Sequence, residues 1–286
     1  MLTVYAPAKV NLVLEVLGKY DEDYHRISSI SQAIGLWDIL NFELADEVSF
    51  KCSEPSLEEG NLVTQAAILL KEVTGYGKGA RIELHKHIPW GMGLGGGSSD
   101  AAVTLLTLNE LWGSCLSLPE LLSLASRLGS DVPFFIQGGT ALVEGKGERV
   151  TALPSPPAAW FVLLVPPLPR MAGKTRQLYN KLGRGHYTRG EFVRAALLSL
   201  MQGKWIAPSL LFNVFDQIVS DVFPGIDEYR KKFREAGAAS VCLSGCGSCL
   251  FAILYDETEA NELCLFLERQ GLECYVASSL LRGPGG

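Results

Sequence analysis

The 286-residue sequence lacks long apolar runs, a surplus of basic charge and any strong compositional bias. Its hydrophobic segments, such as residues 160–165, are far shorter than the roughly 20 residues that span a bilayer, so no membrane partner is expected. Acidic residues outnumber basic ones by 31 to 25, and the net charge of −6 argues against nucleic acid as a partner. Hydrophobic residues at 48% and charged residues at 20% exclude a disordered, collagen-like or coiled-coil chain.

The cysteines and the first residues of the chain predict a cytoplasmic protein. Seven cysteines, an odd number and unevenly spread, are typical of reduced thiols rather than of a disulfide framework. Residues 1–7 lack a basic region followed by an apolar run, so no signal peptide is expected. The length allows one large domain or two ordinary ones.

Hydrophobic periodicity predicts an α+β chain of two lobes. Strands are expected over residues 2–6, 10–17, 27–34, 39–44, 80–85, 160–165, 239–243, 250–254 and 273–277. Helices are expected over residues 61–71, 101–112, 118–128, 174–182, 190–202, 209–221, 226–236 and 257–269, and a charged turn over residues 18–23. The proline cluster at 154–157 is the best candidate linker, which predicts an N-terminal lobe over 1–155 and a C-terminal lobe over 156–286.

A glycine loop over residues 88–100, Ile-Pro-Trp-Gly-Met-Gly-Leu-Gly-Gly-Gly-Ser-Ser-Asp, lies between a predicted strand and a predicted helix. Glycines allow positive φ and close approach to an anion, and a helix start adds free N–H groups and a positive dipole end. The loop is not a P-loop, because no Gly-Lys-Ser/Thr follows it. Its place 90 residues into the chain disfavours a dinucleotide fold. We predict a phosphate-binding loop, in which Ser98 and Ser99 can bind phosphate oxygen or a metal.

Two charged residues outside this loop are candidates for chemistry. Lys9 and Asn11 are two residues apart in a strand-like stretch, so both can face one cleft. Asp131 precedes an apolar Val-Pro-Phe-Phe segment, where a carboxylate needs a partner. Phosphoryl transfer needs groups that position the attacking oxygen and offset charge, and a lysine–aspartate pair supplies both. From the residues alone, a surface lysine and a helix-capping aspartate stay open as alternatives.

The spacing Cys242-x3-Cys246-x2-Cys249 matches that of a [4Fe–4S] cluster of radical enzymes, and an iron–sulfur enzyme is a third-ranked alternative. Only 37 residues follow Cys249, too few for the barrel that such enzymes build. We expect flanking strands to bury Cys242 and Cys249 as small hydrophobic residues.

Several segments resemble motifs of the GHMP kinases (galactose, homoserine, mevalonate and phosphomevalonate kinases). The glycine loop resembles their nucleotide loop, Ala-Pro-Ala-Lys-Val-Asn-Leu at 6–12 their first motif, and Leu-Ser-Gly-Cys-Gly-Ser at 243–248 their third. Residues 17–25, which end in Tyr-His, and Gly-Ser-Asp-Val-Pro-Phe-Phe at 129–135 are similar to the branch whose acceptor is a cytidine diphosphate derivative. The resemblance implies a two-lobed fold with an N-terminal lobe like domain 2 of ribosomal protein S5 and a ferredoxin-like C-terminal lobe.

The resemblance also implies an ATP-dependent small-molecule kinase that uses Mg²⁺. It makes Lys9 and Asp131 the catalytic pair and places Asn11, Tyr24 and His25 around the acceptor. The residues that it assigns to ATP are Asn61, Lys86, Trp90, Gly91, Met92, Gly93, Leu94, Gly95, Gly96, Gly97, Ser98, Ser99 and Asp100. Mg²⁺ is expected to bind through the phosphates, with Ser98 as a candidate ligand. Another kinase of the family, such as a homoserine kinase, and an ATP-binding sensor without turnover are alternatives, as a monomer or a homodimer.

Overall fold

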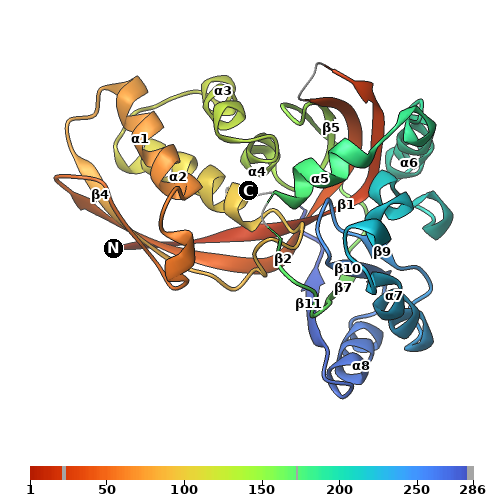
Figure 1. Ribbon diagram of the computed structural model, residues 1–286. Helices are drawn as coiled ribbons and strands as arrows, with labels where there is room; N and C mark the ends of the chain where they lie inside the picture. Colours follow the sequence, from red (N-terminus) through yellow and green to blue (C-terminus); the bar gives the residue numbers. More distant parts are fainter. Residues whose placement is uncertain (21–23, 172, 282–286) are drawn as a thin grey trace.

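The computed structural model describes residues 1–20, 24–171 and 173–281, so residues 21–23 of the predicted turn lie outside the described residues. Within these ranges the chain forms two β-sheets (Figure 1). The larger has seven strands: β1 (Leu2–Lys19), β2 (His25–Ala45), β3 (Ser49–Cys52), β4 (Gly79–His85), β5 (Thr140–Gly145), β6 (Arg149–Ala152) and β8 (Phe212–Asn213). The smaller is antiparallel, in the order β11 (Glu273–Ser278), β7 (Trp160–Val165), β10 (Leu250–Leu254) and β9 (Cys242–Leu243).

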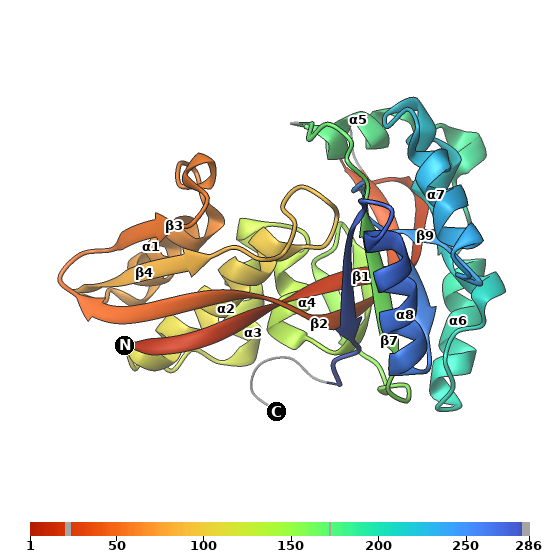
Figure 2. The ribbon, with the colours of Figure 1, turned by 90° about the horizontal axis from the view of Figure 1, so that it is seen from below.

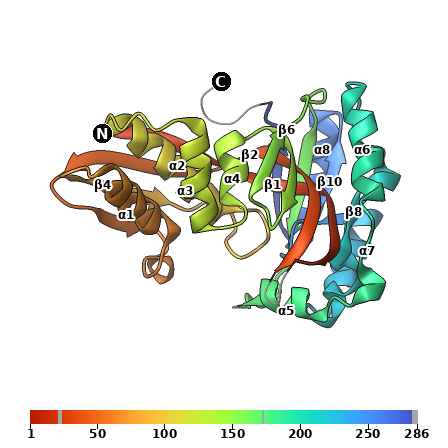
Figure 3. The ribbon, with the colours of Figure 1, turned by 90° about the horizontal axis from the view of Figure 1, so that it is seen from above.

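Helices pack against both sheets. In Figures 1 and 3, four helices cover one face of the larger sheet: α1 (Leu62–Thr74), α2 (Gly96–Leu111), α3 (Leu118–Leu128) and α4 (Val132–Gln137). In the C-terminal half lie α5 (Lys174–Lys181), α6 (Glu191–Met201), α7 (Ile226–Glu235) and α8 (Glu257–Glu268). Figure 2 shows α8 running alongside β7 and β11. No helix in the described ranges is long and apolar enough to cross a membrane.

The first two strands are longer than predicted. Neither strand ends near Pro7 or Gly35, and β1 and β2 are antiparallel neighbours from Leu2–Phe42 to Lys19–His25, with shifts of register at three places. One of these shifts lies between Pro7 and Ala8, and such an irregularity accommodates a proline inside a strand. The prediction of four separate strands here is therefore wrong, and its physical reason is this local bulge.

Most predicted helices are confirmed within a few residues because their end signals are local. The Asn61 side chain accepts a hydrogen bond from the Val63 N–H and starts α1, and Ser117 forms a capping box with Glu120 at α3. The six-residue α4 is too short for periodicity and was not predicted. A prediction that proved wrong is the helix over 209–221.

Short 3-10 turns and β8 replace that helix. Asn213 explains the replacement, because its side-chain amide donates to the carbonyl oxygens of Leu243 and Gly245, both at 2.9 Å. Its side-chain oxygen accepts from the Phe215 N–H at 3.0 Å. These bonds hold the segment as strand β8, which pairs in parallel with β1 in the larger sheet. The boundary between 155 and 156 stays a prediction.

One apolar cluster joins the two sheets. It includes Leu12 and Ile34 from the larger sheet and Phe161 and Phe251 from the smaller, each at most 1% exposed. Burial of large side chains such as these contributes roughly 1.5–3 kcal/mol each. The cluster therefore holds the strand that carries Lys9 in a fixed relation to the C-terminal half.

Candidate active site

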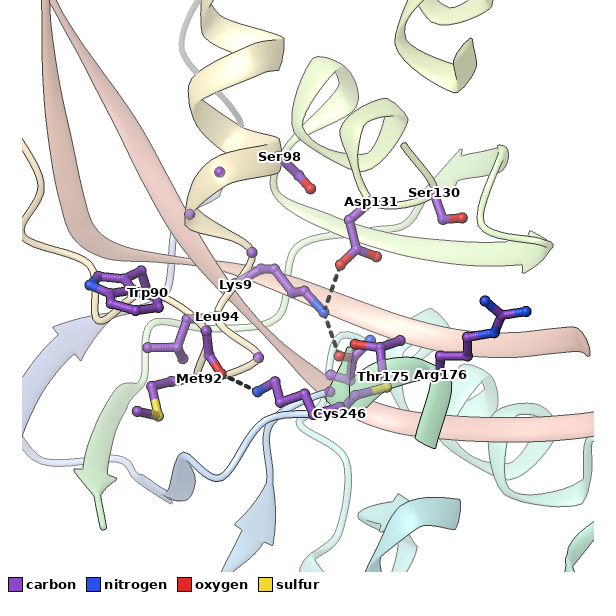
Figure 4. A pocket seen from close by; sticks show the side chains of 18 of the residues that line it. Lys9, Trp90, Met92, Leu94, Ser98, Ser130, Asp131, Thr175, Arg176 and Cys246 are labelled. Carbon is purple, nitrogen blue, oxygen red and sulfur yellow. Dashed lines mark hydrogen bonds and ion pairs between the residues drawn. The ribbon is translucent and has the colours of Figure 1, made fainter. Parts of the chain in front are cut away.

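A cavity of about 1360 Å³ lies where β1, the glycine loop and the starts of α4 and α5 meet (Figure 4). With one exception, every site residue predicted from the sequence lines this cavity: Lys9, Asn11, Tyr24, His25, Asn61, Lys86, Trp90, Gly91, Met92, Gly93, Leu94, Gly95, Gly96, Gly97, Ser98, Asp100 and Asp131. The exception is Ser99, which is fully buried and lies outside the lining. Successive helical residues point about 100° apart, so the neighbouring Ser98 can face the cavity while Ser99 faces the interior.

Lys9 and Asp131 meet inside the cavity. The Lys9 Nζ lies 3.5 Å from Asp131 Oδ2 and donates a hydrogen bond to Asn11 Oδ1 at 2.6 Å (Figure 4). The Asn11 amide in turn donates to the hydroxyls of Ser29 and Ser31 on β2, at 2.9 and 3.1 Å. The Lys9 side chain is 5% exposed and that of Asp131 is 47% exposed. The Lys9 ammonium is thus fixed by Asn11 on the buried side, while the Asp131 carboxylate faces the open cavity.

Backbone contacts place these two side chains beside the glycine loop. The Lys9 N–H donates to the Leu94 carbonyl oxygen at 2.9 Å, which joins β1 to the loop. Asp131 is the residue before α4, whose apolar side chains are buried in the core. A Cβ at Gly95, where φ is +75°, would lie 2.7 Å from the ring of Phe135 on α4. A glycine is required there for β1, the loop and α4 to approach so closely.

A second loop, residues 244–248, braces the glycine loop. The Ser244 hydroxyl donates to the Gly93 carbonyl oxygen at 3.0 Å, and the Cys249 N–H donates to that of Met92 at 3.3 Å. A Cβ at Gly247 would lie 1.8 Å from the Met92 oxygen, so the two backbones touch without room for a side chain. The first and third predicted motifs and the glycine loop therefore form one site.

We expect Gly93→Ala to destabilise the fold by at least about 1 kcal/mol. Gly93 has φ +84°, and an added Cβ would lie 2.0 Å from the Ser244 carbonyl oxygen. Gly97→Ala is the matched control, because Gly97 lies in α2 with no atom within 4 Å of an added Cβ. Thermal unfolding of both variants measures the effect. Equal melting temperatures would contradict the close packing of the two loops.

Lys86 reaches the cavity, but carboxylates surround its ammonium. It bonds Asp38 of β2 and, at 2.8 Å, Asp100 Oδ2 of α2. Asp38 also accepts from the backbone N–H groups of His87 and Ile88, at 2.6 and 2.9 Å. Burial alone would lower the pKa of Lys86, but the two carboxylates outweigh it and raise that pKa. Burial raises the pKa of Asp100 to about 7.

The far end of the cavity is aromatic. His25 is 9% exposed, and neither ring nitrogen has a hydrogen-bond partner in the described part of the chain. Its ring lies 5.1 Å from that of Tyr179 and 5.9 Å from that of Tyr187. Burial, and next the charge of Lys19, lower the pKa of His25, so the ring is neutral at pH 7. The Tyr24 ring lies 4.3 Å below the ammonium of Lys146.

Among the residues that line the cavity without having been predicted are Lys146, Lys174 and Tyr179. Lys146 stands between glycines in the Glu-Gly-Lys-Gly-Glu segment at 144–148, which was the available signal. For Lys174 the signal was Gly-Lys-Thr at the start of a predicted helix, since this tripeptide ends the loop of P-loop proteins. Nothing in the sequence distinguishes Tyr179 from an ordinary core aromatic residue.

The three clustered cysteines take different places. The predicted burial of Cys242 and Cys249 is confirmed, at 8% and 0% exposure. Cys246 lines the cavity beside Thr175 (Figure 4), and burial raises the pKa of its thiol to about 12. Across the described residues, no group of three or more His, Cys, Asp or Glu side chains is placed to hold a metal ion.

Two family models match the chain. The model of the GHMP kinases N terminal domain matches residues 61–139, and that of the GHMP kinases C terminal matches residues 195–272. The chain belongs to the GHMP kinase family. The predicted family and its α+β fold are confirmed, and the glycine loop of this GHMP kinase lies within the first match.

Known proteins resemble this GHMP kinase over its whole length. A 4-diphosphocytidyl-2-C-methyl-D-erythritol kinase from Dehalococcoides mccartyi is 42% identical over 285 residues, which are 99% of each chain. A crystal structure of 4-(cytidine 5'-diphospho)-2C-methyl-D-erythritol kinase matches with a TM-score of 0.82 and 32% identity, covering 99% and 100% of the two chains. Homoserine kinase from Cytophaga hutchinsonii, at 20% identity and a TM-score of 0.75 over 99% and 96% of the chains, shares the fold.

Proposed function

We propose that this GHMP kinase transfers the γ-phosphoryl group of ATP to the 2-hydroxyl of 4-diphosphocytidyl-2-C-methyl-D-erythritol, a step of non-mevalonate isoprenoid precursor biosynthesis. The full-length similarity to kinases named for this substrate supports the proposal. The observation that carries it is a single cavity with a glycine loop at one end, an aromatic end around His25, and Lys9–Asp131 between them. This order matches a reaction in which a nucleotide donor meets a cytidine-bearing acceptor.

The Lys9–Asp131 pair is assigned the proton transfer. Asp131 faces the cavity and can accept the proton of the attacking hydroxyl. Lys9 is tethered by Asn11 and offers its ammonium to the same hydroxyl, where it offsets the developing charge. Catalysis of this type depends mainly on positioning and charge stabilisation, because phosphoryl transfer needs little covalent chemistry from the protein.

ATP is assigned to the glycine loop, with its purine toward Asn61. The donor set of the cavity fits Mg²⁺, which takes one or two protein ligands when phosphates supply the rest. The Ser98 hydroxyl, which lines the cavity, is the protein group that would hold it. The ion would neutralise the phosphate charge, a contribution that this acidic chain lacks overall.

The acceptor base is assigned to Tyr24 and His25. A neutral His25 has one donor and one acceptor nitrogen, which suits the edge of a cytosine. Removing a stacking ring costs roughly 1–3 kcal/mol per base. We therefore expect Tyr24→Ala to raise KM for the cytidyl acceptor about 10- to 100-fold, with KM for ATP unchanged. Steady-state kinetics with each substrate varied test this, and an unchanged acceptor KM would place the base elsewhere.

Release of ADP on adding ATP, Mg²⁺ and the cytidyl acceptor tests the proposed function. Homoserine, mevalonate and galactose serve as parallel acceptors, and Asp131→Asn as the blank. Release with the cytidyl acceptor alone supports the proposal. Release with another acceptor would keep the kinase assignment and overturn the substrate, whereas ATP binding without any turnover would favour the sensor.

A further inference from the structure

The lysines that the sequence assigns to this site are already engaged. Lys9 bonds Asn11 and lies beside Asp131. Lys86, predicted to contact ATP, is 5% exposed and lies between two carboxylates that are themselves at most 2% exposed. Two carboxylates outnumber one ammonium, so this cluster brings no net positive charge to a triphosphate. Besides the assigned Mg²⁺, a cation that faces the phosphates is therefore to be sought among the other basic residues that line the cavity, which are Lys19, Lys146, Lys174 and Arg176.

Lys174, the first residue of α5, has the required position. It lines the same cavity, and its ammonium donates a hydrogen bond to the carbonyl oxygen of Gly91 in the glycine loop. It lines the cavity together with Gly91 of the glycine loop and Cys246 of the loop that braces it. Within the described ranges it forms no ion pair with a carboxylate. Its ammonium, which has three N–H donors, also lies 5.8 Å from the centre of the Phe223 ring.

We propose that Lys174 binds the phosphates of ATP, its ammonium turning from the Gly91 carbonyl oxygen to a phosphate oxygen when the nucleotide enters. The inference rests on the ATP site of the proposed function. The flexible four-carbon stem of lysine allows this change without movement of α5. Burial lowers the pKa of Lys174 to about 8, because no carboxylate opposes the loss of solvent. An anion placed beside this ammonium restores the missing charge partner and therefore binds strongly.

The test is calorimetric titration of the full chain with Mg²⁺ and AMPPNP, and separately with adenosine, which lacks phosphates. We expect Lys174→Met to weaken AMPPNP binding roughly 10- to 100-fold, the usual range for a lost charge-assisted bond. Adenosine binding should change less than about twofold by the same reasoning. Lys174→Arg should keep most of the affinity, because it retains the charge.

Lys181→Met is the matched control. Lys181 ends the same helix, lies outside the cavity and pairs with Asp221 at 3.4 Å on the surface. This variant should bind AMPPNP as the wild type does. Circular dichroism of each variant checks that the fold is retained.

Two results would overturn the inference. Lys174→Met with unchanged AMPPNP affinity would exclude a phosphate contact, and equal losses for AMPPNP and adenosine would show that Lys174 only braces the glycine loop. The titration uses no acceptor, so its result does not depend on which acceptor the kinase phosphorylates. Suppose that Lys174→Met weakens AMPPNP binding but not adenosine binding, and that the wild type phosphorylates a different alcohol. The role of Lys174 would then hold, and the proposed acceptor would be wrong. A wild type without AMPPNP affinity would overturn both.

Discussion

Replacing Asp131 by asparagine is expected to lower kcat by roughly 10²- to 10⁴-fold, the usual contribution of a general base. Asparagine has the same size and can still accept a hydrogen bond, but it cannot take the proton of the acceptor hydroxyl. Lys9, at 3.5 Å, would keep its bond to Asn11 and its place on β1. KM for ATP should therefore change little, and steady-state kinetics separate the two parameters.

The control for this substitution is Asp221→Asn, an exposed aspartate paired with Lys181 and outside the cavity. It should leave kcat unchanged. Asp131→Asn with more than a tenth of wild-type kcat would show that Asp131 orients the acceptor without accepting its proton. A similar loss in Lys9→Met would then point to charge stabilisation as the main contribution of the pair.

The parts of the fold that could be predicted from the sequence are those with local signals. Caps and periodicity located α1 and α3. The density of glycines located the loop before α2, but the predicted end of this loop was wrong, because residues 96–100 already belong to the helix. The failed helix over 209–221 shows the limit, because its outcome depends on bonds from Asn213 to carbonyls about 30 residues away. The same holds for β1, whose continuation past Pro7 depends on pairing with β2.

The site, too, was predicted only where its signals are local in the sequence. Nearly all of the residues that the motifs predicted line the cavity, but the motifs did not give the charge environment of these residues. Asp38, which bonds Lys86 from 48 residues away, carried no signal in the sequence. Without Asp38, Lys86 looks like a phosphate ligand; with it, Lys86 is the centre of a buried cluster that joins β2 to α2. Only the fold shows that difference.

That cluster leads to the largest expected effect on stability. We expect Lys86→Met to destabilise the fold by about 3–5 kcal/mol, the usual cost of removing one partner of a buried ion pair. Methionine fills a similar volume, but Asp38 and Asp100 would face each other at 0% and 2% side-chain exposure without a cation. Urea unfolding at pH 8 measures the loss. Lys181→Met, which breaks an exposed pair, should cost about 0–1 kcal/mol.

The loss should depend on pH with a defined sign. Burial already raises the pKa of Asp100 from 3.8 to about 7 in the presence of Lys86, and removing the ammonium raises it further. Between the unfolded and the folded pKa, Asp100 is protonated in the folded state but not in the unfolded state. The free energy of unfolding therefore falls as pH rises toward the folded pKa. Lys86→Met should therefore regain stability as pH is lowered from 8 to 6. The double variant Lys86→Met/Asp100→Asn lacks one of the two unpaired charges and should therefore regain stability at pH 8. If both variants lose the same stability at pH 6 as at pH 8, packing and not charge holds α2 against β2.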